Sequence, residues 1–150
     1  MHNKNSTIAE TYSSWAYDLK IEDIPKTVIE KLNIIVMDSI GLMIYAKNED
    51  YIKSLLDALN ENGNCNLIGH NRKVNAFNAA IINGTAVHGE DFDDTFEGTP
   101  VHVGAVMVPA MLAVAEAKNL SGQEFLKGLA IGSELICRLA LVAPTAVHRQ

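Results

Sequence analysis

Residues 24–46, IPKTVIEKLNIIVMDSIGLMIYA, decide the fold class that we predict for this chain. Pro25 suits the first turn of a helix, because its fixed φ matches that turn and its missing N–H would have no partner there. Apolar residues follow at helical spacing, and in the second half they cover most of the circumference. They are Val28, Ile29, Leu32, Ile35, Val36, Ile40, Met43 and Ile44. We predict a central helix that ends near Ala46 and whose second half is buried on several sides. Asp38 is then a buried carboxylate or a hydrogen-bond partner of a neighbouring helix end.

Further segments on both sides of this stretch have the same helical period. They are residues 6–19, 51–59, 73–88, 103–118 and 121–143. In the segment 73–88, small residues such as Ala79 and Gly84 allow neighbouring helices to approach closely. The last segment begins with a capping box of Ser121 and Glu124 and ends before Pro144.

The connection 64–72 is predicted to be irregular, and within it Leu67 and Ile68 could form one short strand without an obvious partner. No run of useful length alternates between apolar and polar residues, as a half-buried sheet would require, and no repeat of fixed period is visible. The predicted fold class is therefore all-α, a helical bundle or part of one.

Composition excludes several classes of function. The chain has 150 residues and a net charge of -6, so it has no basic surface for nucleic acid or an anionic membrane. Its longest charge-free apolar run is too short to span a bilayer, and no secretory signal is visible at the N-terminus. Cys65 and Cys137 are too few and too isolated for a disulfide framework or a zinc site. We expect reduced cysteines and a cytoplasmic protein.

The candidate site lies in residues 83–104, NGTAVHGEDFDDTFEGTPVHVG, where a dense polar stretch interrupts two apolar helices. Binding and catalytic residues concentrate in loops that a rigid scaffold holds on each side. The polar residues of this stretch are His88, Glu90, Asp91, Asp93, Asp94, Thr95, Glu97 and His102.

Three neighbouring carboxylates, Asp91, Asp93 and Asp94, repel one another, so burial would raise the pKa of at least one of them. His102 is their natural partner, because a histidine can transfer a proton near neutral pH and can bind a carboxylate when protonated. An equally weighted alternative is that residues 91–95 satisfy unpaired backbone donors at a helix end.

A metal site is a third interpretation, with Asp91, Asp93, Asp94 and His88 as ligands. The stretch lacks the spacing of a calcium loop and the His-x-x-x-His of a zinc helix, so we predict that no metal is needed. The two common phosphate-binding loops, GxGxxG and GxxxxGK[ST], are absent from the sequence, and we predict no cofactor.

Residues 83–117, NGTAVHGEDFDDTFEGTPVHVGAVMVPAMLAVAEA, resemble the signature of the MmgE/PrpD family. That signature has Asn-Gly, then His, then Asp-Phe/Tyr-Asp-Asp-Thr, and then His-x-Gly leading into a helix rich in Pro and Ala. The resemblance extends back through residues 24–46 and forward through GLAIGSELICRLALVAP at 128–144. Here Val103 stands where many members have Pro. The resemblance implies that residues 1–150 are the N-terminal, incomplete part of the family's helical domain, without its lid domain.

The family includes 2-methylcitrate dehydratase, cis-aconitate decarboxylase and iminodisuccinate epimerase, which move protons beside a carboxylate without metal or organic cofactor. The resemblance thus implies a lyase that acts on a small di- or tricarboxylate. An isomerase or epimerase of the same family and a non-catalytic helical domain are the alternatives. Asp91, Thr95 and His102 match the family's active-site residues. They imply proton relay by Asp91, hydrogen bonding by Thr95, and carboxylate contact or proton transfer by His102. The supporting residues are Asp93, Asp94 and His88.

Members of the family are much longer and have further active-site residues, namely a later histidine, lysines and a tyrosine. His148 could belong to a second active-site segment or be a surface histidine. With only His102 to balance the charge of a polycarboxylate, we expect the missing cationic groups to come from beyond Gln150 or from another chain. We therefore expect residues 1–150 to be a fragment, a truncated product or one part of a split protein. We also expect a homodimer or an association with the missing C-terminal part, and no turnover by these residues alone.

Overall fold

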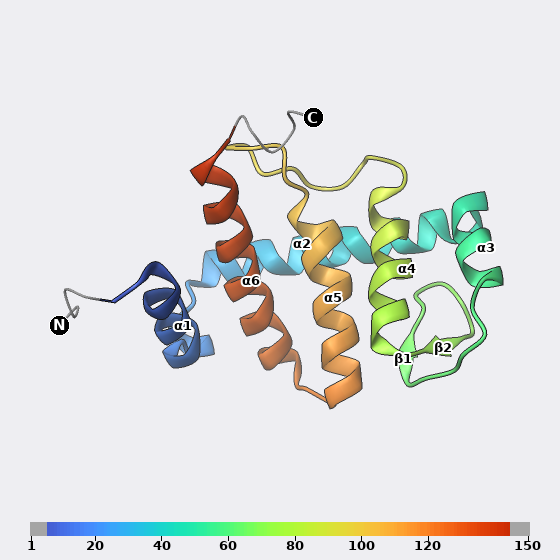
Figure 1. Ribbon diagram of the computed structural model, residues 1–150, viewed down its shortest axis with the longest axis horizontal. Coiled ribbons are helices and arrows are strands. Elements are labelled where there is room, and N and C mark those ends of the chain that lie inside the picture. Colours follow the sequence, from blue (N-terminus) through green and yellow to red (C-terminus); the bar gives the residue numbers. More distant parts are fainter. Residues whose placement is uncertain (1–5, 145–150) are drawn as a thin grey trace.

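The computed structural model describes residues 6–144, which form six α-helices and one small antiparallel strand pair (Figure 1). The predicted all-α bundle is confirmed. The helices are α1 (Ile8–Asp18), α2 (Lys26–Tyr45), α3 (Asp50–Asp57), α4 (Ala76–His88), α5 (Val103–Lys118) and α6 (Gly122–Val142). Short 3₁₀ turns precede α2 at Ile21–Asp23 and follow it at Ala46–Asn48. His148 lies outside the described residues.

Helices α4, α5 and α6 run side by side, and α2 crosses behind all three (Figure 1). The closest pair is α4 and α5, where small residues bring the two backbones together as predicted. A Cβ added at Gly84 would lie 3.3 Å from the carbonyl oxygen of Ala105 and 3.4 Å from the Pro109 ring. The end of α4 and the start of α5 are therefore held at a fixed separation, and both border the polar loop.

The predicted burial of α2 on several sides is wrong. One face, with Leu32, Ser39 and Met43, is buried against the bundle. On the opposite face Ile34 is 54% exposed and Met37 is 69% exposed, and Asp38 is also exposed. The reason is that, within residues 6–144, helices pack against α2 from one side only.

The connection between α3 and α4 contains strands that the sequence analysis did not place correctly. β1 (Cys65–Asn66) pairs antiparallel with β2 (Lys73–Val74), whereas we predicted one unpartnered strand at Leu67 and Ile68. Helix α4 accordingly begins at Ala76, with Asn75 as its N-cap, and not at Lys73. Each strand has two residues, which is too few for a period-two pattern.

The helix ends follow the sequence signals closely. Ser121 and Glu124 form the predicted capping box of α6, and that helix ends at Val142, before Pro144. Cys65 and Cys137 are free thiols, as expected. No helix within residues 6–144 combines the length and the apolar character needed to cross a membrane.

Candidate active site

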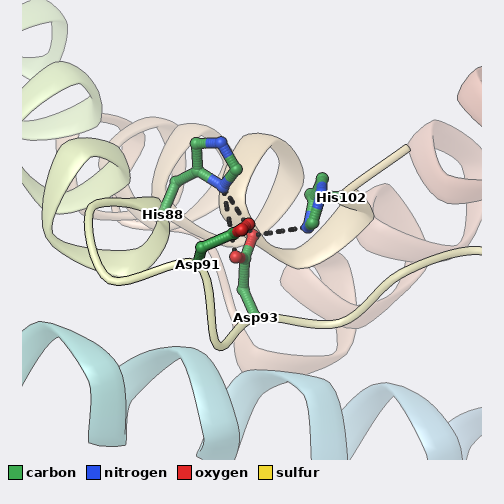
Figure 2. Close-up of side chains that lie close together, drawn as sticks. All are labelled: His88, Asp91, Asp93 and His102. Atoms are coloured by element: carbon green, nitrogen blue, oxygen red, sulfur yellow. Dashed lines mark hydrogen bonds and ion pairs between the residues drawn. The ribbon is translucent and has the colours of Figure 1, made fainter. Parts of the chain in front are cut away.

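The candidate site is built at the junction of α4 and α5. His88 is the last residue of α4, and His102 is the N-cap residue of α5. Because these helices pack side by side, two histidines separated by a long loop meet, with ring centroids 4.8 Å apart. The scaffold thus supplies two imidazoles, and the loop 89–102 supplies the carboxylates between them (Figure 2).

Asp93 lies at the centre of the site. Its side chain is only 1% exposed, and its Oδ1 lies 3.1 Å from His88 Nδ1. Its Oδ2 lies 3.2 Å from His102 Nδ1, as an ion-pair contact whose geometry is not that of a hydrogen bond. A buried carboxylate in contact with both imidazoles orients the two rings.

Asp91 joins the same group from a strained backbone position. Its φ of 56° lies in the left-handed region, where Asp is one of the better tolerated residues. Its N–H donates to the His88 carbonyl at 3.0 Å, which closes a tight turn directly after α4. Ligand atoms of His88, Asp91, Asp93 and His102 all lie within 4.8 Å of one another. The structure therefore brings together Asp91 and His102, as predicted, with Asp93 between the two histidines.

Asp94 is not part of this cluster. Its Oδ1 accepts the Gly104 N–H at 2.8 Å, so it caps the start of α5, as the helix-capping alternative predicted for this part of the loop. A Cβ at residue 104 would overlap the Asp94 carboxylate, which explains why glycine fits there. Burial raises the pKa of Asp94, repulsion by Asp93 and Asp38 adds to this, and the Gly104 bond and His102 oppose it.

Thr95 is not part of the His88–Asp91–Asp93–His102 cluster. It is exposed and lines, with Asp94, a groove of about 410 Å³ between α2 and α6. Lys31 of α2 lines the same groove. The expectation that His102 is the only local cationic group is therefore wrong, because α2 contributes a lysine that lies far from the polar stretch in the sequence.

The first turn of the loop is held from α3. Tyr51 Oη donates to Glu90 Oε1 at 2.9 Å, and burial together with this hydrogen bond raises the pKa of Tyr51 to about 12. From the sequence, Tyr51 was expected only as part of the helical segment 51–59. Gly89 beside the site was the available signal, since a glycine next to polar functional residues often marks a close approach by another group.

The four clustered groups could also hold a metal ion, because they offer two imidazole nitrogens and two carboxylate oxygens. The set differs from the one predicted, since His102 replaces Asp94, which binds the α5 backbone instead. That no metal is needed stays a prediction.

Fold and site together define an all-α protein with a histidine and carboxylate cluster between two packed helices. The chain belongs to the MmgE/PrpD family, because the model of the MmgE/PrpD N-terminal domain matches residues 10–150. The resemblance noted in the sequence is thus confirmed.

Several curated relatives are similar over most of this chain. The cis-aconitate decarboxylase-like protein oryM of Aspergillus oryzae is 29% identical over 131 residues, which cover 81% of this chain and 27% of that protein. The cis-aconitate decarboxylase of Aspergillus terreus is 26% identical over 141 residues, covering 88% and 29%. The human cis-aconitate decarboxylase is 27% identical over 148 residues, covering 93% and 31%. The chain spans less than a third of the length of these relatives.

Proposed function

We propose that this chain carries part of the active site of a cofactor-free lyase that acts on a small di- or tricarboxylate, with decarboxylation of cis-aconitate as the leading reaction. The observation that carries the proposal is Asp93, a buried carboxylate between the imidazoles of His88 and His102. The names of the relatives support the choice of decarboxylation over dehydration and epimerisation.

The arrangement suits proton transfer beside a carboxylate. In a decarboxylation the bond between carbon and the departing carboxylate breaks, its electron pair stays on the carbon, and a proton must be delivered there. His102 is the proposed donor or the contact for a substrate carboxylate, since it is partly exposed and its ring is oriented by Asp93. Asp91, in the same cluster, is the proposed relay that returns a proton to the imidazoles.

A polycarboxylate brings two or three negative charges, which need more cationic groups than two histidines. Lys31 lies on the groove that Asp94 and Thr95 also line, so we infer that this groove is the path by which one substrate carboxylate approaches and that Thr95 donates a hydrogen bond to it. We also infer that residues 1–150 form the N-terminal part of a helical domain. Further chain or a homodimeric partner would supply the remaining cationic groups and the lid.

Incubation of the protein with cis-aconitate, 2-methylcitrate and iminodisuccinate tests the proposal, with product analysis by NMR. Release of CO₂ from cis-aconitate supports it. Dehydration of 2-methylcitrate or epimerisation of iminodisuccinate would assign the alternative reactions of the family. If residues 1–150 alone are inactive, the same assay on the longest open reading frame that contains them decides, and inactivity of that protein towards all three compounds would refute the proposal.

A further inference from the structure

The corner between α2 and α3 contacts the loop 89–102 through two tyrosines. Tyr51, at the start of α3, donates its hydroxyl to Glu90. Tyr45, at the end of α2, packs its ring against Phe92 with centroids 6.4 Å apart. Glu90 and Phe92 are the two neighbours of Asp91, so each side of that residue contacts the same corner.

The contact at Tyr51 is close enough to exclude any side chain at Gly89. A Cβ added at Gly89 would overlap the Tyr51 ring, so the ring lies directly on the backbone where α4 ends. The next residues make the turn in which Asp91 adopts its positive φ. The strained residue of the site is thus preceded by a segment that Tyr51 holds by both packing and a hydrogen bond. Positions of this kind persist only where the surroundings support them.

We propose that Tyr51 is a positioning residue for the reaction, holding Glu90 so that the Asp91 carboxylate stays turned towards His88 and Asp93. The inference rests on the function proposed above, since it gives that site a supporting residue from α3. Tyr51 does not reach the clustered atoms itself, and no hydrogen bond other than that to Glu90 is formed by its hydroxyl within residues 6–144. It acts through the loop backbone.

The protonation state of Tyr51 agrees with this role. Burial is the main cause that raises its pKa to about 12, and the hydrogen bond to Glu90 adds to it. The phenol therefore keeps its proton at any pH at which the enzyme would work, and it stays a donor rather than exchanging protons with substrate. A group that keeps its proton keeps the same hydrogen bond to Glu90 throughout the working pH range.

Tyr51→Phe isolates the hydroxyl, because the phenylalanine ring still packs on Gly89. Tyr45→Phe is the matched control, since the Tyr45 hydroxyl forms no hydrogen bond within the described part of the chain. In residues 1–150 we expect Tyr51→Phe to speed amide exchange at Asp91 about tenfold and to shift the ring resonances of His88, as follows from loss of one hydrogen bond. Equal exchange rates and equal ring shifts in the two variants would overturn the proposal, whatever the protein's activity.

Two further variants test whether the effect passes through Glu90. Glu90→Ala removes the acceptor and should match Tyr51→Phe, whereas Glu90→Gln keeps an acceptor oxygen and should restore most of the protection at Asp91. The double variant Tyr51→Phe/Glu90→Ala should lose no more than either single variant, because one interaction is removed in all three. Additive losses would mean that the two residues act separately, and the proposal would be wrong.

Activity supplies the last readout, in the protein form that turns over substrate. Tyr51→Phe should lower kcat about tenfold and change KM less than twofold, since orientation of the reacting groups is lost and substrate contacts are kept. If Tyr51→Phe disturbs the loop but leaves kcat unchanged, the positioning role is wrong. If the wild-type protein turns over no carboxylate while the loop readouts behave as expected, the proposed function fails and the anchoring of the loop by Tyr51 stands.

Discussion

Two polar connections flank α4, and their side chains are used in opposite ways. In the connection 58–75, polar side chains bind backbone groups. Arg72 donates to two carbonyls at the end of α3, and Glu116 accepts the Asn66 N–H. Asn83 of α4 accepts the Ile68 N–H and donates to the Asn66 carbonyl, both at 3.0 Å. These side chains hold the backbone of the connection in place.

In the loop 89–102 the polar side chains face one another instead. His88, Asp91, Asp93 and His102 converge, and within residues 6–144 none of their side chains is hydrogen-bonded to the backbone. Asp94 is the exception, since it caps α5. The comparison teaches that a high density of polar residues does not by itself mark a functional site. A polar side chain that hydrogen-bonds to the backbone stabilises the fold. A polar side chain with spare hydrogen-bonding capacity is available for chemistry.

The largest expected effect is the loss of activity in His102→Ala. Removal of a general acid or base costs about a hundredfold or more in kcat. The fold should persist, with a change of less than about 1 kcal/mol in the free energy of unfolding, because a partly exposed imidazole adds little to core packing. Turnover and urea unfolding of the same variant check both statements. Robust activity would show that the cluster is not catalytic.

Asn83→Ala should instead lower the free energy of unfolding. Asn83 is 3% exposed, and its loss leaves the Ile68 N–H and the Asn66 carbonyl without partners, at a cost of about 2 kcal/mol. Asn33→Ala is the control, since Asn33 is an exposed residue of α2 and should lose nothing. Urea unfolding compares the two variants. Equal free energies of unfolding in the two variants would mean that the side chain of Asn83 does not stabilise the connection 58–75.

The helices were predicted well from the sequence, whereas the contacts between elements were predicted less well. The small apolar segment at 103–118 matches α5 at both ends, because polar residues clearly bound a continuous apolar run there. The two-residue strands were missed, since they are too short to have a period. The burial of α2 was overestimated, because a pattern of apolar residues does not show whether another helix covers them. At the site, the residues close in sequence were predicted, whereas Tyr51, which is 39 positions from Glu90, was not.

Asp94→Asn tests the exception in the second loop. Because burial raises the pKa of Asp94 in the folded state, its contribution to stability is fully present below the ordinary value of 3.8 and is lost as the pH rises through the folded pKa. An asparagine does not ionise and can still accept the Gly104 N–H. We expect the variant to be modestly more stable than wild type near neutrality and equal to it in strong acid. Urea unfolding midpoints of both proteins at both pH values check this. Equal midpoints near neutrality would contradict it.

The smallest expected effect concerns Tyr51, which links the loop 89–102 to α3. With its folded pKa raised from 10.0 to about 12, the stability that its protonated hydroxyl contributes is fully present below pH 10.0 and is lost as the pH rises through about 12. Glu90→Ala should bring the phenol back towards its ordinary pKa, because it removes the hydrogen bond and the neighbouring charge. The part of the shift that comes from burial should remain. Ultraviolet difference titration of the tyrosinates in wild type, Glu90→Ala and Tyr51→Phe identifies the late-titrating residue. Burial also raises the pKa of Tyr12, so part of the late phase should remain in Tyr51→Phe. A late phase of unchanged amplitude in Tyr51→Phe would show that Tyr51 does not contribute to it and would contradict the prediction.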